Sequence, residues 1–192
     1  MKTNYLVLLW MFLSIFACSK DNESDPVPQE TRNPVYLDAN GITVKARDWA
    51  RPGDKGTIDG IEYRVVDNFS IGVLLQSGNA NVCTTRVTDM KGLFCACDFE
   101  SGDFNKDISS WDVSNVRDMS EMFYGAYEFN QPIGVWDVSK VTNMARMFAA
   151  TIKFNQDLSA WNTANVQDCA DFSGNAAEWQ QPKPSFANCN VD

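Results

Sequence analysis

Two consecutive stretches of the chain, WDVSNVRDMSEMFYGAYEFNQPIGV at residues 111–135 and WDVSKVTNMARMFAATIKFNQDLSA at residues 136–160, carry one pattern of residues. A third copy begins WNTANVQDCADFSGNAAEWQQP at residue 161, and its columns align with the first two without gaps. A degenerate copy, VCTTRVTDMKGLF at residues 82–94, precedes them and carries four extra residues before Phe104. A period of about 20 to 50 residues is typical of stacked units that bury their apolar sides against one another.

Each 25-residue copy suggests a short extended piece at Val-x-x-Met, a helical turn that carries Met-Phe, and a corner at Phe-Asn. We therefore predict an α/β repeat solenoid of the leucine-rich-repeat type, with a short strand plus a helix or turn in each coil. Trp111, Trp136 and Trp161 recur in step with the other apolar columns, which favours core positions over an exposed sugar-stacking platform. Asn130 and Asn155 predict a ladder of amides that bond backbone at successive corners, with ligand contacts as the alternative.

A strand-rich segment precedes the repeats. VYLDANGITVKA and GTIDGIEYRVV are typical of short strands joined by tight turns, and FSIGVLLQ is typical of a short helix. We expect this segment to be a small β-rich cap at the N-terminal end of the solenoid. The predicted boundaries are a signal peptide at 1–17, a lipidated Cys18 with a flexible tether at 18–34, the cap at 35–81, repeat units at 82–110, 111–135, 136–160 and 161–181, and a C-terminal cap tail at 182–192.

The repeats closely resemble those of the BspA-like leucine-rich-repeat surface lipoproteins of bacteria, whose unit has the form WDVSNVTDMSxMFxGAxxFNQxIxx. Residues 111–160 follow that form almost throughout, and VTDM at 87–90 matches it too. The strand-rich opening VYLDANGITVKA also resembles the family. The resemblance implies a cell-surface protein, and some members of the family act as adhesins toward host proteins or other bacteria. It supplies no catalytic residue for this chain.

The first residues predict an export signal that ends in a lipid anchor. The run LVLLWMFLSIF at residues 6–16 is shorter than the about 20 apolar residues that span a bilayer, so it fits a signal peptide. Ala17-Cys18 resembles a bacterial lipobox, in which the cysteine is acylated; ordinary cleavage near Ala17 is the alternative. The acidic tether that follows resembles the surface-export signal of Bacteroidetes-type lipoproteins. We expect a protein anchored in the bacterial outer membrane and facing the cell exterior, with the periplasmic side as the alternative.

The composition argues against catalysis and against nucleic-acid binding. The 192 residues carry a net charge of −9, which repels a phosphate backbone. The chain has no histidine, which excludes Ser-His-Asp and Cys-His catalysis and the commonest transition-metal ligand. Two carboxylates can hydrolyse a glycan, but aspartates such as Asp112, Asp137 and Asp157 recur with the repeat and form no evident pair. We expect a protein that is not an enzyme and that uses no metal and no cofactor.

The last repeat unit departs from the pattern where a closing cap is needed. Cys169 replaces the methionine of its column, and Cys189 lies in the tail that follows. We predict a disulfide between these two cysteines, which would pin the tail over the last unit. In an oxidising compartment such a bridge stabilises a fold by about 2–4 kcal/mol.

Three further cysteines lie at the start of the repeats, and they cannot all pair with one another. We expect Cys83 to form a bridge with Cys97 or Cys95, which leaves the remaining cysteine free or paired between chains. A redox or metal role for the Cys95-Ala96-Cys97 motif is the alternative. No second cysteine pair has the spacing of zinc ligands, so the structural interpretation is favoured.

Ligand contacts in a repeat protein are expected in columns that vary while the core columns stay fixed. The candidate binding-surface residues are Thr88, Arg117, Thr142, Gln167, Tyr124 and Tyr127, and the insertion at 98–103 is a further candidate. We expect a non-catalytic, adhesin-like module that binds a protein on a host or bacterial surface. The alternatives are a structural or accessory component of an envelope assembly, which binds an envelope protein, and, more remotely, a carboxylate-based glycan hydrolase.

Overall fold

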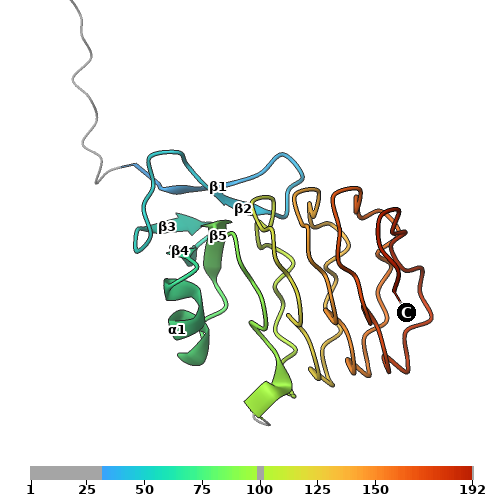
Figure 1. The fold of residues 1–192 in the computed structure, drawn as a ribbon. Helices are drawn as coiled ribbons and strands as arrows, with labels where there is room; N and C mark the ends of the chain where they lie inside the picture. Colours follow the sequence, from blue (N-terminus) through green and yellow to red (C-terminus); the bar gives the residue numbers. More distant parts are fainter. Residues whose placement is uncertain (1–31, 99–101, 192) are drawn as a thin grey trace, which may run out of the picture. The chain divides into compact units, whose positions relative to one another are not determined.

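The structure is a computed structural model that describes residues 32–98 and 102–191 (Figure 1). The chain divides into two units, Met1–Arg32 and Asn33–Asp192, and the helices and strands of the described residues all belong to the second. The predicted signal peptide, Cys18 and most of the tether lie outside the described residues. Within the described part of the chain, no helix is both long and apolar enough to cross a membrane.

A two-stranded sheet comes first in the compact part of the chain that begins at Asn33. β1 (Val35–Leu37) pairs antiparallel with β2 (Val44–Ala46), where the sequence predicts a hairpin. The Asn40 side chain closes the connection, because its Oδ1 accepts hydrogen bonds from the backbone N–H groups of Ile42 and Thr43, both at 2.9 Å. A side-chain acceptor of this kind replaces the backbone bonds that a turn leaves unmade.

A three-stranded sheet follows. β3 (Lys55–Ile58) pairs antiparallel with β4 (Ile61–Asp67) across the second predicted turn, in which Asp59 and Gly60 have φ values of 49° and 81°. β5 (Val82–Arg86) then adds in parallel to the other side of β4. The strand order β3-β4-β5 therefore ends on the first residues of the repeats.

Strands β4 and β5 separate two apolar clusters, because successive side chains of a strand point to opposite faces. Val65 and Cys83 point into a small cluster that they share with residues of β1 and β2. Val66 and Val82 point the other way, into a large cluster that extends through the repeats as far as Trp179. The strand-rich segment and the first repeat unit therefore share one sheet and one core.

The single α-helix of the described residues, α1 (Ser70–Gln76), connects β4 to β5. The Asp67 carboxylate orders its first turn by accepting hydrogen bonds from the Ser70 N–H at 2.9 Å and the Ser70 hydroxyl at 2.6 Å. These bonds lower the pKa of Asp67 below its ordinary value. One exposed side of the helix is apolar, since Phe69 and Val73 are 88% and 63% exposed. Large exposed apolar side chains that lie together mark surfaces that bind partners.

The fold class predicted from the repeats, an α/β repeat solenoid with a strand and a helix or turn in every coil, is wrong. The protein is small and mostly sheet-based, and its two sheets and its α-helix all precede residue 87. Beyond β5, the described residues form one short 3-10 helix, η2 (Ala96–Asp98), and otherwise turns, bends and single bridges. The strand expected at Val-x-x-Met is reduced to one bridging residue in each unit, such as Asp118.

The repeat units form neither strands nor helices because their backbone N–H groups alternate between two kinds of acceptor. At every second residue the N–H donates to a carbonyl of the following unit: from Met119 to Asn143, from Glu121 to Ala145 and from Phe123 to Met147, each at 2.9 Å. The N–H groups between them donate within the unit, as Met122 does to the Met119 carbonyl at 3.2 Å. A helix needs consecutive N–H groups to bond within its own segment. We call the bonds between units the inter-unit ladder.

The inter-unit ladder repeats at each junction and holds the backbone in an unusual conformation. It also joins residues 90–94 to 118–122 and residues 144–148 to 168–172. The residue at its centre is left-handed in every unit, and the φ values are 61° at Gly92, 59° at Glu121, 56° at Arg146 and 52° at Asp171. Because only glycine adopts this conformation without a steric cost, the ladder must hold the other three residues in it.

Aromatic side chains stack through the large core in step with the units. The ring centroid of Phe129 lies 5.9 Å from that of Phe104, 4.0 Å from Phe123 and 5.8 Å from Phe154. The tryptophans of the repeat column are buried, as their register predicts: Trp111, Trp136 and Trp161. Aromatic pairs of this kind add about 0.5–1.5 kcal/mol each beyond the burial of their area.

A row of amides runs along one corner of the units. Asn105 Oδ1 accepts hydrogen bonds from the Asn130 N–H at 3.0 Å and from Gln131 Nε2 at 2.7 Å. One unit later, Asn130 Oδ1 accepts from the Asn155 N–H at 3.0 Å and from Gln156 Nε2 at 2.7 Å. The asparagines therefore satisfy backbone donors at successive corners, as the sequence predicts.

Repeated aspartates close turns between the corners. Asp137 Oδ1 accepts a hydrogen bond from the Ser139 N–H at 3.1 Å, and Asp157 Oδ1 accepts one from the Ser159 N–H at 2.9 Å. Hydrogen bonds from these serines lower the pKa values of both carboxyl groups. Both aspartates therefore serve the turns of the fold.

We expect Phe129→Ala to destabilise the protein by about 3–5 kcal/mol, because it empties a site in the middle of the aromatic stack. Urea denaturation of the full chain, followed by tryptophan fluorescence, measures the loss. Val135→Ala is the matched control, since Val135 is 47% exposed and its truncation should cost less than about 0.5 kcal/mol. Equal losses for the two variants would show that the stack is not what stabilises this region.

We expect the melting temperature to fall on acidification below about pH 4. Asp67, Asp137 and Asp157 have lowered pKa values when folded, so they stabilise the fold fully above their unfolded pKa of about 3.9 and lose this effect as the pH falls through the folded values. Calorimetry between about pH 7 and pH 2 measures the effect, and Asp157→Asn should make the fall smaller. A melting temperature that rises on acidification contradicts the assignment.

Candidate functional site

The four candidate residues of the variable column form one surface row. The Arg117 N–H donates to the Thr88 carbonyl, the Thr142 N–H to the Arg117 carbonyl and the Gln167 N–H to the Thr142 carbonyl, each at 2.8 Å. Parallel backbones bonded in this way lie about 4.8 Å apart. The side chains stay exposed or half-buried, so two hydroxyls, a guanidinium and an amide stand in line on a fixed backbone. We call these four residues the variable row.

The two candidate tyrosines have surroundings of their own. The Arg146 guanidinium lies 4.6 Å from the centre of the Tyr124 ring and 3.0 Å from the Glu121 carboxylate, so it covers one side of that ring. Tyr127 is exposed, and its ring lies so close to Gly102 that an added Cβ would come within 3.0 Å of Cδ2. Within the described residues no hydrogen bond connects either tyrosine side chain to the variable row. The six predicted residues therefore do not form one site.

A groove between α1 and the first repeat unit was not predicted from the sequence. One wall comes from residues 68–76 and the other from residues 89–93, and the space between them measures about 670 Å³. It adjoins a second hollow of about 500 Å³, lined further along by Phe94, Cys95 and residues 103–106. We call the two hollows together the α1 groove.

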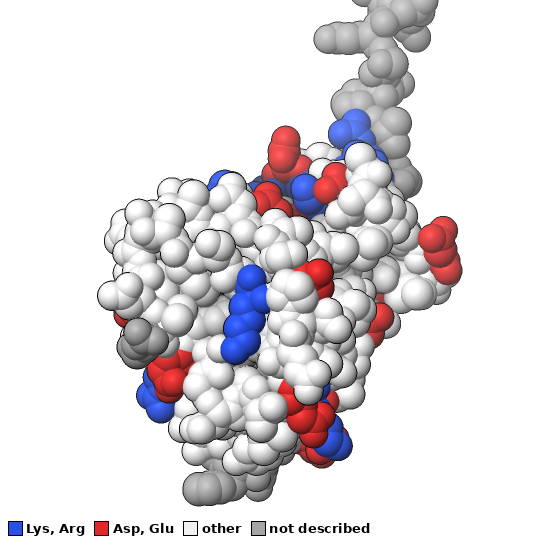
Figure 2. Space-filling model, turned by 90° about the vertical axis from the view of Figure 1, so that its right-hand side faces the viewer, with Lys and Arg blue, Asp and Glu red and all other residues white. Residues whose placement is uncertain are grey.

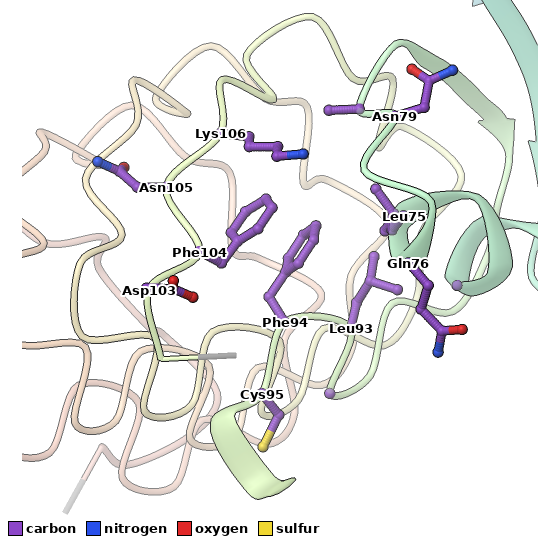
Figure 3. A pocket seen from close by; sticks show the side chains of 13 residues that line it. Leu75, Gln76, Asn79, Leu93, Phe94, Cys95, Asp103, Phe104, Asn105 and Lys106 are labelled. Atoms are coloured by element: carbon purple, nitrogen blue, oxygen red, sulfur yellow. The ribbon is translucent and has the colours of Figure 1, made fainter. Parts of the chain in front are cut away.

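Aromatic rings form the inner part of the α1 groove. The rings of Phe94 and Phe104 stack with their centroids 3.7 Å apart, and Figure 3 shows both pointing into the hollow, with Leu75 and Leu93 beside them. Lys106 lies at the mouth, where its Nζ donates to a backbone carbonyl of the α1–β5 connection at 2.6 Å. These apolar side chains lie among polar ones such as Gln76, Asn79 and Asp103, and they suit a ligand that inserts an apolar group.

The C-terminal tail covers the last repeat unit. Cys169 and Cys189, the pair expected to pin the tail, form a disulfide with their Cα atoms 5.8 Å apart. Phe186 of the tail packs edge-on against Phe172, at 5.0 Å between ring centroids. Figure 2 faces the end of the molecule that the C-terminal part of the chain forms, and uncharged side chains cover most of it. This end therefore presents few charged side chains to a partner.

The expected bridge from Cys83 to Cys97 or Cys95 is not formed. Cys95 and Cys97 bond to each other, and Cys83 is free and buried. The alternation of β5 directs its side chain into the small cluster, where the thiol donates to the Val44 carbonyl at 3.5 Å. Burial raises the pKa of the Cys83 thiol, so it stays protonated at neutral pH and is not a nucleophile.

Sequence reasoning missed the α1 groove because the groove depends on how a helix packs against the first unit. One signal was available in the sequence. A seven-residue helix that buries Ile71 on one side cannot also bury Phe69 and Val73 on that side, so both must be exposed. In the residues that the structure describes, no three cysteine or acidic side chains gather closely enough to hold a metal ion. The groups present can bind by shape and hydrogen bonding, and the basic side chains are Arg117 in the row and Lys91 and Lys106 in the groove.

A family model described as "Mycoplasma protein of unknown function, DUF285" matches residues 69–186, which is more than half of the chain. The matched range includes α1, the variable row and nearly all of the α1 groove. No curated protein and no solved structure matches the chain significantly. DUF285 is the family of BspA-like repeat proteins, to which the resemblance of the repeats pointed. The chain therefore belongs to the DUF285 family.

Proposed function

We propose that this protein is a lipid-anchored component of the bacterial cell surface that binds a protein ligand and catalyses no reaction. The observation that carries the proposal is the variable row. Its side chains differ between neighbouring units, while the backbone bonds between Thr88, Arg117, Thr142 and Gln167 repeat at 2.8 Å. A backbone fixed before binding loses little conformational entropy when a ligand docks, which favours affinity.

The chemistry of the chain supports binding over catalysis. The sequence has no histidine to act as a base near neutral pH. Aspartates of the repeat, such as Asp137 and Asp157, have lowered pKa values and accept hydrogen bonds within turns. A general acid in glycan hydrolysis needs a raised pKa instead.

The sequence at residues 1–34 supports a surface location by lipid anchor. Its apolar run ends at Cys18, and the acidic tether that follows gives the body reach from the membrane. Several acyl chains on one cysteine hold a protein on a membrane stably, whereas a single chain holds it marginally. Membership in DUF285 agrees with a surface protein of this kind.

We expect Cys18→Ala to move the protein from the membrane fraction to the soluble fraction, because the acylated side chain is the anchor. Fractionation and immunoblotting of cells that make the wild type and the variant measure the change. Protease added to intact cells should remove the wild-type protein. Protection until the outer membrane is broken would contradict surface exposure and favour an accessory role inside the envelope.

We expect the double substitution Arg117→Ala and Gln167→Ala to weaken capture of the protein ligand at least about tenfold, since truncated contacts at the centre of an interface typically cost more than 1 kcal/mol. The ligand is first isolated by cross-linking the full-length protein on intact cells, and its affinity is then measured by surface plasmon resonance. Lys55→Ala is the control, because Lys55 lies in β3, is exposed and forms an ion pair with Glu62 at 2.7 Å. An unchanged affinity with the double variant would exclude the variable row.

A further inference from the structure

The first repeat unit lacks the donors that every later unit receives. In the later units each ladder carbonyl, such as that of Ala145, accepts an N–H from the preceding unit. Asp89, Lys91 and Leu93 hold the corresponding places in the first unit, and Gly92 repeats the left-handed conformation that lies at the centre of each segment. Within the described residues, nothing donates a hydrogen bond to these three carbonyls.

The three carbonyls border the α1 groove. Residues 89–93 form one wall of the groove, and α1 forms the other. Within the described residues, α1 donates no backbone hydrogen bond to this wall, because the N–H groups of a helix point along its axis and not sideways. The groove therefore holds three backbone acceptors, each two residues from the next. They are spaced as at a junction between two repeat units, but the unit that would donate to them is missing.

We propose that the α1 groove binds a short polypeptide segment of the protein ligand, which donates backbone N–H groups from three alternate residues to the carbonyls of Asp89, Lys91 and Leu93. This inference rests on the proposed function and gives it a site. It is a form of recognition in which a peptide extends an existing ladder of backbone bonds, so that main-chain bonds give affinity and side-chain pockets give specificity. A residue that tolerates a left-handed backbone, glycine above all, suits the middle of the segment.

The arrangement of donors and acceptors favours a peptide over a second copy of the chain. Two first units placed face to face would set carbonyl against carbonyl, which excludes a symmetric dimer through this edge. The last unit of another copy does present free N–H groups at Asp171 and Ser173 among the described residues. However, Ile71 and Leu75 of α1 already pack on the core where the apolar side of such a unit would have to lie. A segment of a few residues meets no such obstacle.

The side chains around the groove add an apolar anchor. Phe69 and Val73 are exposed on the α1 wall, and the stacked Phe94 and Phe104 rings line the inner hollow. The groove also continues the variable row, because Thr88 ends the row directly beside Asp89. A ligand can therefore contact the row with its surface while one segment enters the groove.

The test uses a capped peptide with the sequence RDMSEMFYGA of residues 117–126, whose N–H groups at Met119, Glu121 and Phe123 make the natural ladder. Its binding to the full chain is measured by isothermal titration calorimetry. N-methylation at Glu121 and Phe123 removes two donors and should weaken binding at least about tenfold, since each bond contributes about 1 kcal/mol. N-methylation at Ala126, beyond the three donors, should leave binding within about twofold.

Substitutions in the protein locate the site. Val73→Glu places a carboxylate in the groove and should abolish peptide binding, whereas Val135→Glu, at another exposed valine, should not. Equal binding of the methylated and unmethylated peptides would overturn backbone pairing, and so would no binding of the unmethylated peptide. Self-association in sedimentation velocity that Val73→Glu removes would overturn it in favour of a second copy. If the peptide fails while the ligand still depends on Arg117 and Gln167, the groove inference falls and the proposed function stands.

Discussion

The structure depends on one constraint: at each unit junction, every second backbone N–H donates to the next unit. The bonds from Met119, Glu121 and Phe123 fix the distance between units, and the aromatic rings then stack because their attachment points repeat. The same bonds keep Glu121 and Arg146 in a backbone conformation that neither would adopt alone. The core side chains, the corner amides and the variable row all repeat in register, because the inter-unit ladder is in register at each junction. Loss of the ladder would therefore remove several interactions at once.

Side-chain burial could be predicted from the sequence more accurately than backbone conformation. The column of Trp111, Trp136 and Trp161 identifies core positions, because a strict period in apolar residues survives whatever the local conformation is. The prediction of a strand plus a helix or turn in each unit is wrong, since a left-handed residue such as Arg146 interrupts a strand or a helix and its side chain gives no signal of it. The pairing of Cys83 fails for a related reason: it depends on the face of β5 toward which the thiol points.

The candidate site divides in the same way. The residues of the variable row could be predicted, because they occupy one column of an aligned repeat, and aligned columns lie side by side. The α1 groove could not, because it lies where the repeat stops and a helix of unrelated sequence takes the place of a unit. Row and groove meet at Thr88 and Asp89, where the Asn68 side chain fixes the backbone by accepting the Thr88 N–H at 2.7 Å. Both features therefore belong to one continuous surface.

The uniform direction of the inter-unit ladder has a consequence for how such a protein changes over evolutionary time. Every junction has donors on one side and acceptors on the other, so a duplicated unit fits between any two existing units. Such a duplication leaves the helix α1 at one end and the disulfide-held tail at the other unaltered. It lengthens the variable row by one side chain, which is then free to diverge. Recombination within the gene can thus extend the recognition surface without any change in α1 or in the C-terminal tail.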